Sequence, residues 1–519
     1  MERIGLNWIE FGEGIVTEVN LVKSSLSRRM WRENHYWRFF VNIIYVNPDE
    51  MRADALACYG HSLAQTPNFD RLAAEGTRFD QCHVQHTVCT PSRCSFMTGW
   101  YPHTAGHRTL WNPLQLHEPN TMRYLKQAGY DVHWLGKNDC LAPEAFASSV
   151  TKIYGPGEGN VGSSENVFKK GEAGYYSFLN TAMDGPPCDA LYYERAIEYL
   201  QGRKADDAPF FMFLPTNFPH PTYHAPEPWY SMYDPDDLPP LRPVVEEGKP
   251  DYHRLIRDYR DLNNVDESVL RKIMAVYLGM TSYVDHLLGQ LLDALEETGL
   301  GEETVVLAFS DHGDWAGDYG LVEKWPSGLD DTLTRVPLIV RMPGGAKGHV
   351  VEEPVELFDI VPTTLALAGV EAQHTHYAQS LMPQLHGAAG NPQRAVFTEG
   401  GYDLHEPHCF EGKPSDGVAG NPEGIYYPKG MQQQEQPESV CRAVMIRTQE
   451  HKLVWRPKGQ SELYDLAEDP HELQNVFDRE DYRQLQRDLE RRLLEWQTRT
   501  GDVVPFEPRP RGFPPELVS

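Results

Sequence analysis

The sequence predicts an α/β fold: a three-layer α/β/α sandwich with a mixed, mainly parallel sheet, plus a smaller C-terminal α+β subdomain with an antiparallel sheet. Short, mainly apolar segments recur before residue 392, as in strands that are buried on both faces of a parallel sheet. Segments of helical periodicity separate them, which favours alternating strands and helices. After residue 392, apolar and polar residues alternate, which is typical of antiparallel strands with one exposed face.

The buried strands are expected to be short, apolar and rich in β-branched residues. Residues 41–46 meet this description, and further buried strands are expected at residues 131–135, 209–214, 304–309 and 336–340. The longest helical pattern covers residues 268–297, and a second covers residues 190–201. A third helix is expected to begin after Asn120, a good N-cap residue, and to stop at Gly129.

The C-terminal subdomain is expected to contain half-exposed strands and one amphipathic helix. The strands are predicted at residues 395–400, 441–448 and 451–456, and the helix at residues 478–498. A Gly- and Pro-rich loop is expected over residues 400–439, and a Pro-rich tail follows the helix. We therefore divide the chain into an N-terminal extension of unknown role (1–38), a main α/β domain (39–391) and the C-terminal subdomain (392–519).

Charge and composition exclude several classes of protein. The 519 residues include 47 Lys and Arg against 75 Asp and Glu, a formal net charge of −28. Nucleic-acid binding needs a basic surface, and an acidic surface repels anionic membranes, so neither partner is expected. No run of about 18 apolar residues predicts a transmembrane helix. The acidic N-terminus lacks the features of a secretory signal, and the eight cysteines are sparse, so we expect free thiols and a cytoplasmic protein.

Polar residues follow the predicted strands at the points where these strands end. The clusters are Asp49–Glu50, Lys137–Asn138–Asp139, His220 and Asp311–His312. A fifth stretch, CTPSR at residues 89–93, is expected to open a helix, because proline is favoured in a first helical turn. Ligands bind at the carboxyl edge of a parallel sheet, so we expect the five stretches to meet there.

The CTPSR stretch, continued by CSFMTG to Gly99, resembles the Cys-x-Pro-Ser-Arg signature of the type I, formylglycine-dependent sulfatases of the alkaline phosphatase superfamily. Other segments resemble that family in the same order. They are the two metal-binding segments (Asn42–Gly60 and Phe309–Trp325), the Gly-Lys segment (Gly136–Asp139) and the His segment (Phe218–Pro226). The resemblance covers residues 41 to about 380, and extends more loosely to Glu462–Asn475.

The resemblance implies that a maturation enzyme oxidises Cys89 to formylglycine. A hydrated aldehyde carries two hydroxyls on one carbon: one attacks sulfur and expels the alcohol, and the other then loses its proton so that sulfate is released. Arg93 is expected to hold the modified side chain through its planar guanidinium. For an isolated cysteine, the alternatives are a buried apolar thiol or a simple thiolate ligand.

The resemblance also implies one divalent metal ion, bound by modified Cys89 and by Asp49, Glu50, Asp311 and His312. Oxygen-rich ligation suits a hard cation, so we expect Ca²⁺ first, with Mn²⁺ or Mg²⁺ as alternatives. Many sulfatases have Asn in place of His312, and the imidazole favours Mn²⁺, as the similar phosphonate monoester hydrolases imply. Many members also have Asp in place of Glu50. The longer Glu50 side chain can either bind the metal ion or lie beside it without binding.

The remaining site residues are cationic. Lys137 and Lys324 are implied to bind the oxygens of the transferring group as point charges. His220 is the candidate acid that protonates the leaving oxygen, because imidazole titrates near neutral pH. Many relatives have a second histidine where this chain has Asp139, so the identity of the proton donor stays open. Asp139 can instead orient Lys137.

The expected function is hydrolysis of a sulfate monoester, with an aryl or carbohydrate sulfate as the small-molecule substrate. One alternative is a phosphonate monoester or phosphodiester hydrolase with the same nucleophile, which Asp311–His312 slightly favours. The other is a catalytically silent binding protein of the same fold, which the complete set of Cys and metal-binding residues disfavours. The sequence does not identify the alcohol part of the substrate, and it is compatible with a homo-oligomer.

Overall fold

An eight-stranded sheet forms the middle layer of the computed structural model, which describes residues 41–155, 159, 161–506 and 511–512. The strand order is β10-β2-β9-β7-β1-β6-β4-β5. The four central strands are parallel neighbours: β7 (Thr304–Phe309), β1 (Asn42–Asn47), β6 (Phe210–Pro215) and β4 (Asp131–Leu135). Their positions agree with the predicted strands, because most residues of each segment are apolar.

The outer strands make the sheet mixed. β9 (Leu338–Arg341) runs antiparallel to both β7 and β2 (Thr77–Phe79), whereas the edge strands β10 (His349–Val351) and β5 (Lys152–Tyr154) are parallel to their neighbours. The predicted mixed, mainly parallel sheet is therefore confirmed. The N-terminal extension predicted for residues 1–38 and most of the Pro-rich tail lie outside the described residues.

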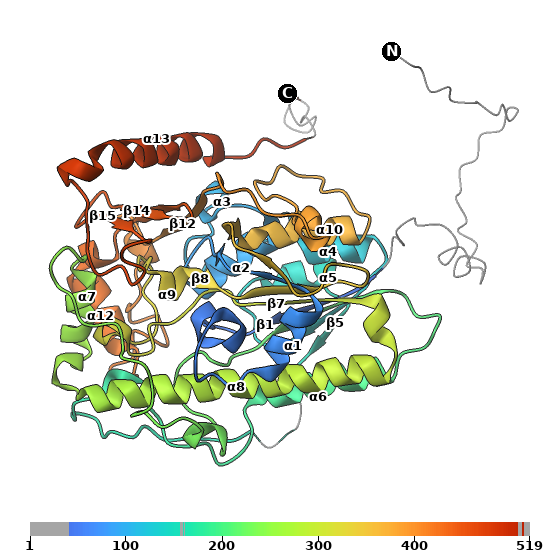
Figure 1. Ribbon diagram of the computed structural model, residues 1–519, viewed down its shortest axis with the longest axis horizontal. Coiled ribbons are helices and arrows are strands. Elements are labelled where there is room, and N and C mark those ends of the chain that lie inside the picture. Colours follow the sequence, from blue (N-terminus) through green and yellow to red (C-terminus); the bar gives the residue numbers. More distant parts are fainter. Residues whose placement is uncertain (1–40, 156–158, 160, 507–510, 513–519) are drawn as a thin grey trace, which may run out of the picture. The chain divides into compact units, whose positions relative to one another are not determined.

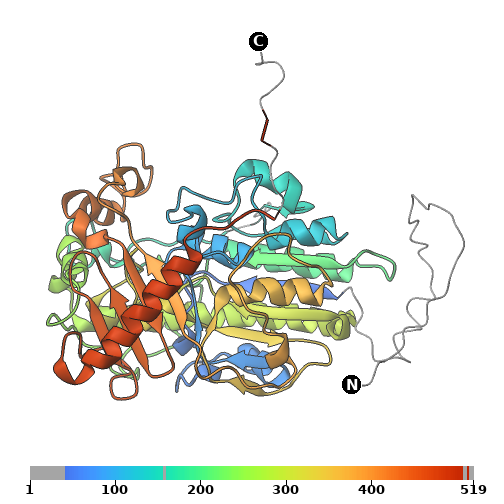
Figure 2. The ribbon, with the colours of Figure 1, turned by 90° about the horizontal axis from the view of Figure 1, so that it is seen from above.

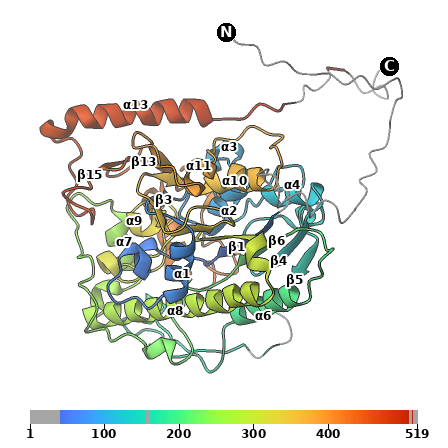
Figure 3. The same cartoon turned by 45° about the vertical axis from the view of Figure 1, so that its right-hand side comes forward.

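Helices cover both faces of this sheet (Figure 1). One face packs against α1 (Pro67–Glu75), α6 (Cys188–Gln201) and α8 (Glu267–Glu297). The other face packs against α2 (Cys89–Thr98), α4 (Thr121–Gln127) and α10 (Ile360–Leu367). Figure 3 shows α6 and α8 together beneath β1, β4 and β6. The three predicted layers are therefore present.

Strand residues alternate between the two faces, as the period of two requires. In β1, Ile44 and Val46 join the core on the α8 side, whereas Ile43 and Tyr45 join the core on the α2 side. All four side chains are fully buried. This explains why the central strands are apolar at successive positions rather than at alternate ones.

The helix signals near Asn120 and Gly129 act as predicted. The Asn120 side chain accepts a hydrogen bond from Arg123 N over 2.8 Å and caps α4. The helix ends at Gln127, and Gly129 follows with a φ of +91°. Such a left-handed φ favours glycine, which has no Cβ.

The C-terminal subdomain contains a separate antiparallel sheet of four strands and one long helix. The strands are β12 (Val396–Gly400), β13 (Ala443–Arg447), β14 (His451–Trp455) and β15 (Glu462–Asp465). Helix α13 (Arg483–Thr500) lies across this sheet, as Figure 2 shows. The first three strands and the helix were predicted, whereas the short β15 was not. The boundary at residue 392 stays a prediction.

The prediction of a loop over residues 400–439 is wrong in part. Residues Tyr427–Glu435 form helix α12, which packs against α7 (Tyr252–Tyr259). Pro428 lies in the first helical turn, where proline is tolerated, but Gly430 weakens the local signal. Contacts with α7 therefore decide the conformation, because tertiary packing stabilises most short helices.

Six two- or three-residue strands of the described chain, the edge strands β5 and β10 among them, also escaped prediction, because so short a segment carries no measurable periodicity. β2 joins the main sheet, and β11 (Val355–Glu356), β3 (Cys82–His83) and β8 (Arg335–Val336) form a small sheet of their own. Within the described residues, no helix has both the length and the apolar composition needed to cross a bilayer. All eight cysteines lie in this part of the chain as free thiols.

Trp496 should be a main anchor of α13. Its ring stacks on Phe397 (centroids 5.0 Å apart, planes 3° apart) and meets Tyr101 edge-on at 5.0 Å. Trp496→Ala should lower the free energy of unfolding by about 3–5 kcal/mol, measured by urea denaturation, because it empties a buried aromatic site. Leu494, on the same helix but 67% exposed, provides the control: Leu494→Ala should change stability by less than about 0.5 kcal/mol. Equal losses for the two variants would contradict this role.

Candidate active site

The four central strands bring polar side chains to one edge of the sheet. Asp49 and Glu50 follow β1, Asp311 and His312 follow β7, Lys137 follows β4, and His220 follows β6. Because these strands are parallel neighbours, their carboxyl ends lie side by side. Cys89 joins them at the first position of α2, where no side chain caps the helix. The structure therefore brings together the five stretches that the sequence singles out.

Gly136 allows Lys137 to approach this edge. Its φ is +147°, and a Cβ placed on it would lie 2.1 Å from the carbonyl oxygen of Pro215. Only glycine avoids this clash. The close approach lets Lys137 N donate a hydrogen bond of 2.9 Å to the same oxygen, which fixes the start of the Lys137 side chain beside β6.

Cys89 lies within an acidic cluster that we define as Asp49, Cys89, Asp311 and His312. The candidate ligand atoms of these residues all lie within 4.8 Å of one another. Cys89 Sγ is 3.3 Å from His312 Nε2 and 3.6 Å from Asp49 Oδ1. His312 Nδ1 lies 3.0 Å from the carbonyl oxygen of Gly313, to which it can donate, and this leaves the lone pair of Nε2 directed into the cluster.

Arg93 pairs with both carboxylates of the acidic cluster. Its Nε donates to Asp311 Oδ2 over 2.9 Å and its Nη2 to Asp49 Oδ2 over 3.1 Å, and all three side chains are fully buried. Buried carboxylates are costly unless they are paired. Ser92 Oγ also donates to the carbonyl oxygen of Asp311 over 2.6 Å, so the first turn of α2 is tied to the end of β7.

Lys137 lies between two carboxylates at the opening of the site. Its Nζ contacts Asp49 and lies 2.8 Å from Asp139 Oδ2, and its side chain is 21% exposed. Burial alone would raise the pKa of Asp49, but the positive charges of Lys137 and Arg93 hold it well below its usual range. Burial likewise opposes the charge on Lys137, and the neighbouring Asp49 raises the pKa of Lys137 well above its usual range. Asp139 thus contacts Lys137 as expected.

Glu50 lies apart from the acidic cluster and forms a second group with Asp49 and His220. Glu50 Oε2 is 2.8 Å from Lys324 Nζ and 3.2 Å from His220 Nε2. Burial raises the pKa of Glu50 well above its usual range, although Lys324 opposes this shift. The longer side chain at position 50 therefore reaches the catalytic lysine expected at position 324.

His220 is held as a hydrogen-bond acceptor for Lys324. Lys324 Nζ donates to His220 Nε2 over 3.0 Å, and His220 Nδ1 lies 2.5 Å from the carbonyl oxygen of Pro221. Burial, together with the nearby charge of Lys324, lowers the pKa of His220 to about 3. These surroundings favour the neutral imidazole, and the role of His220 as proton donor stays a prediction.

The donors fit a divalent cation. Two aspartates and one imidazole converge on Cys89. The carboxylate oxygens suit Ca²⁺, Mg²⁺ and Mn²⁺, and the imidazole nitrogen is a ligand that favours Mn²⁺. Glu50 Oε1 is buried and has no hydrogen-bond partner among the described residues, so its lone pairs are free for a cation. Burial and the negative charge of Asp49 raise the pKa of the Cys89 thiol, so an unmodified thiol stays protonated there.

Several residues that shape the site were not predicted. Tyr277 OH donates to the carbonyl oxygen of Glu50 over 2.7 Å, and Tyr223 OH donates to Asp314 over 2.8 Å. Asp314 lies inside the second metal-binding segment, Phe309–Trp325, so the sequence indicated that it could lie near the site. Tyr277 lies within the long helical pattern of α8, where nothing distinguishes it from a core residue.

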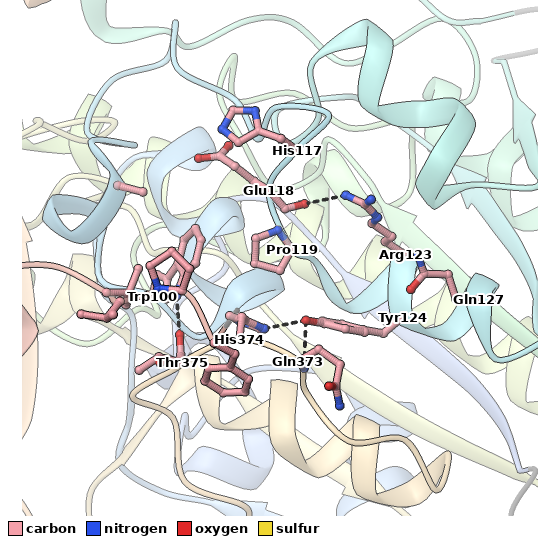
Figure 4. Close-up of a pocket in the computed structure, with 15 residues that line it drawn as sticks. Trp100, His117, Glu118, Pro119, Arg123, Tyr124, Gln127, Gln373, His374 and Thr375 are labelled. Carbon is pink, nitrogen blue, oxygen red and sulfur yellow. Dashed lines mark hydrogen bonds between the residues drawn. The ribbon is translucent and has the colours of Figure 1, made fainter. Parts of the chain in front are cut away.

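The structure also contains a cavity of about 720 Å³, whose lining residues Figure 4 shows. Trp100, Tyr124, His374 and Arg123 are among the residues that line it, and its lining includes none of the predicted catalytic or metal-binding residues. Trp100 follows the last residue of α2 closely, whereas Cys89 begins the helix. A helix of ten residues spans about 15 Å, so the cavity lies at the opposite end of α2.

Comparisons with known proteins agree with this arrangement. A family model for sulfatases matches residues 41–370, and a model for the C-terminal part of N-sulphoglucosamine sulphohydrolase matches residues 423–499. The chain is 27% identical to the multifunctional alkaline phosphatase superfamily protein PehA of Trinickia caryophylli, across 91% of this chain and 98% of that protein. It is 26% identical to an N-acetylglucosamine-6-O-sulfatase of Bacteroides thetaiotaomicron, across 90% and 88%.

A solved structure with a similar fold is the phosphonate monoester hydrolase of Agrobacterium radiobacter. The TM-score is 0.73 at 24% identity, over 89% of this chain and 96% of that chain. At this level of identity the likeness establishes a common fold.

Divalent cations should stabilise the chelator-treated protein. A ligand that binds only the folded state adds about 2.7 kcal/mol at one hundred times its Kd, so Ca²⁺, Mn²⁺ or Mg²⁺ should raise the melting temperature in differential scanning fluorimetry. Asp311→Asn should remove most of this rise, because it withdraws a buried carboxylate from the acidic cluster.

Asp285→Asn provides a matched control. Asp285 is also a buried carboxylate, but it accepts hydrogen bonds from the backbone of Asn68 and Phe69 at the start of α1. The cation-dependent rise in melting temperature of the Asp285→Asn variant should match that of the wild type. An undiminished rise in Asp311→Asn would rule out the acidic cluster as the cation site.

Proposed function

The chain belongs to the sulfatase family of the alkaline phosphatase superfamily and is a sulfuric ester hydrolase, and from this premise we propose that it cleaves a sulfate monoester with Cys89, converted to formylglycine, as nucleophile. One observation supports this most directly. Cys89 Sγ lies 3.3 Å from His312 Nε2 and 3.6 Å from Asp49 Oδ1, at the buried start of α2. A nucleophile placed there lies among the donors that would hold a cation.

Asp49, Asp311 and His312 would hold the divalent cation, and Glu50 has a free oxygen lone pair nearby. The bound cation would supply Lewis-acid chemistry at the nucleophile and at the oxygens of the sulfate group. We propose Ca²⁺, because carboxylate oxygens predominate, with Mn²⁺ as the alternative that the imidazole favours. Arg93 pairs with Asp49 and Asp311 and fixes their orientation.

Lys137 and Lys324 would bind the sulfate oxygens from two sides. Lys137 approaches from β4 and is partly exposed at the opening, whereas Lys324 is held on the opposite side by Glu50 and His220. Fixed positive charges stabilise the charge that develops in the transition state without reorganisation. We keep His220 as the candidate proton donor for the leaving oxygen, because its Nε2 lies at the site within 3.0 Å of Lys324 Nζ.

We propose a sulfated carbohydrate or an aryl sulfate as the substrate. The similarity to an N-acetylglucosamine-6-O-sulfatase supports a sulfated sugar. A second candidate is phosphonate monoester or phosphodiester hydrolysis with the same residues. The contact of His312 with Cys89 and the shared fold with a phosphonate monoester hydrolase favour this second candidate.

We also propose that the protein works in the cytoplasm and depends on a maturation enzyme there. The eight free cysteines support a reducing compartment, since proteins in oxidising compartments commonly use their cysteines in disulfides.

Conversion of Cys89 should be visible by mass spectrometry. Trypsin should release residues 79–93, a peptide that carries both Cys82 and Cys89. Formylglycine lowers the mass by about 18 Da and leaves one thiol to alkylate instead of two. The protein should come from a host that has the maturation enzyme.

Cys89→Ala should abolish turnover and keep the wild-type melting temperature within a few degrees, whereas Cys82→Ala should keep the 18 Da change. Two alkylated thiols in active wild-type protein would refute the formylglycine nucleophile.

Substrate preference should separate the two candidate reactions. Steady-state kcat/KM should be higher for an aryl sulfate than for the matching aryl phosphonate monoester, by at least about a hundredfold. The two substrates share a leaving group, so the ratio isolates the transferring group. A higher value for the phosphonate would establish the second candidate instead.

A further inference from the structure

Two carboxylates flank the ammonium group of Lys324. Glu50 Oε2 lies 2.8 Å from Lys324 Nζ, and Glu323 Oε1 lies 3.7 Å from it. Both carboxylates are at most 1% exposed, and Lys324 is 4% exposed. A buried ammonium group needs compensation by negative charge, and its position follows from where that charge is fixed.

Glu323 is itself held by two further cations. Arg260 Nη2 donates to Glu323 Oε2 over 2.6 Å, and Lys429 Nζ donates to Glu323 Oε1 over 2.7 Å. Arg260 is 1% exposed and lies at the end of α7, whereas Lys429 is 4% exposed and lies on α12. Helices α7 and α12 lie side by side (Figure 1). Each oxygen of Glu323 thus has its own cation, and Oε1 also faces Lys324.

The backbones of the two flanking glutamates are fixed in the same unusual way. Glu50 has a φ of +66° and Glu323 a φ of +64°, in the left-handed region that non-glycine residues seldom adopt. Each is tied to a buried tyrosine: Tyr277 OH donates to the carbonyl oxygen of Glu50, and Glu323 N donates to Tyr223 OH over 3.0 Å. Such conformations persist only where their surroundings enforce them, so both carboxylates are presented rigidly.

We propose that Glu323 is a positioning residue for Lys324, and that Lys429 of α12 and Arg260 of α7 complete the active site by fixing Glu323. The inference rests on the proposed role of Lys324 as a ligand of the sulfate oxygens. Without the Glu323 charge, Arg260 and Lys429 would repel Lys324 with no anion between them. The ammonium group would then move toward Glu50 and away from the substrate.

The charge of Glu323 is needed for this role. Burial would raise its pKa, but Lys429, Arg260 and Lys324 together hold the pKa below its usual range. Replacement by the isosteric glutamine keeps the shape and removes only the charge. Replacement of Lys429 by methionine removes the outer cation and leaves Glu323 in place, and replacement by arginine keeps the charge.

The experiment compares Glu323→Gln, Lys429→Met and Lys429→Arg with a control, Glu472→Gln. Glu472 is also 1% exposed, and it pairs with Lys452 and with the backbone of Asp331 instead of Lys324. The measurements are kcat and KM on whichever substrate the wild type prefers, aryl sulfate or aryl phosphonate. Calorimetric Kd for inorganic sulfate and the melting temperature complete the set.

Glu323→Gln and Lys429→Met should each lower kcat/KM by on the order of tenfold, mainly through kcat, because Lys324 acts most strongly in the transition state. Sulfate binding should weaken, and Lys429→Arg should stay near the wild type. Glu472→Gln should lower the melting temperature and leave kcat/KM within about twofold. In a Lys324→Ala background, Glu323→Gln should leave the Kd for sulfate unchanged.

Two outcomes would overturn the inference: a loss of kcat/KM no larger than that of Glu472→Gln, or an equal loss of sulfate affinity with and without Lys324. If Glu323→Gln fails to fold, the comparison of Lys429→Met with Lys429→Arg decides, and equal kcat/KM values there would also overturn it. Failure of the proposed function is distinguishable, because a wild type that prefers the phosphonate still allows every comparison among the variants.

Discussion

Charge compensation among buried side chains is the constraint on which this structure depends. Asp49 and Asp311 are fully buried close to each other, and like charges so placed are tolerated only with cations between them. Arg93 supplies one cation from α2, and Lys137 supplies another from the end of β4. Each pairing joins segments that are distant in sequence. The ion pairs that compensate the buried carboxylates therefore also fix the carboxyl edge of the sheet.

The fold was predictable where burial on both faces leaves a strong local pattern. The central strands and α8 appear at the predicted positions, because their apolar residues identify them without knowledge of their neighbours. Four of the five site stretches were predictable for a related reason, because each follows a predicted strand, and the stretch at residues 89–93 was predictable from its resemblance to the sulfatase signature. The role of Lys429 was not predictable, because helix α12 depends on packing against α7. No local sequence pattern indicates a contact with a helix that is distant in the sequence. Arg260 and Tyr277 were missed likewise.

The departures from the usual family pattern are compensated within the structure. Asp139, where many relatives have histidine, pairs with Lys137 and helps to keep it charged at the opening. Glu50, where many have aspartate, reaches Lys324 and His220 instead of joining the acidic cluster fully. Lys324 also donates a hydrogen bond to His220 over 3.0 Å. Changes of one residue type at these positions thus alter how charge is distributed across the whole site.

The position of α12 has a consequence for how such proteins diversify. A C-terminal segment that merely covered the sheet could be exchanged between homologues by recombination with little loss. Here β12 joins the main body through a hydrogen bond from Glu399 N to the carbonyl oxygen of Gln85, and α12 inserts a buried lysine beside Glu323. A chimera that imports a foreign C-terminal segment would inherit mismatched charges in its interior. The charge balance of the interior therefore depends on residues from both parts of the chain.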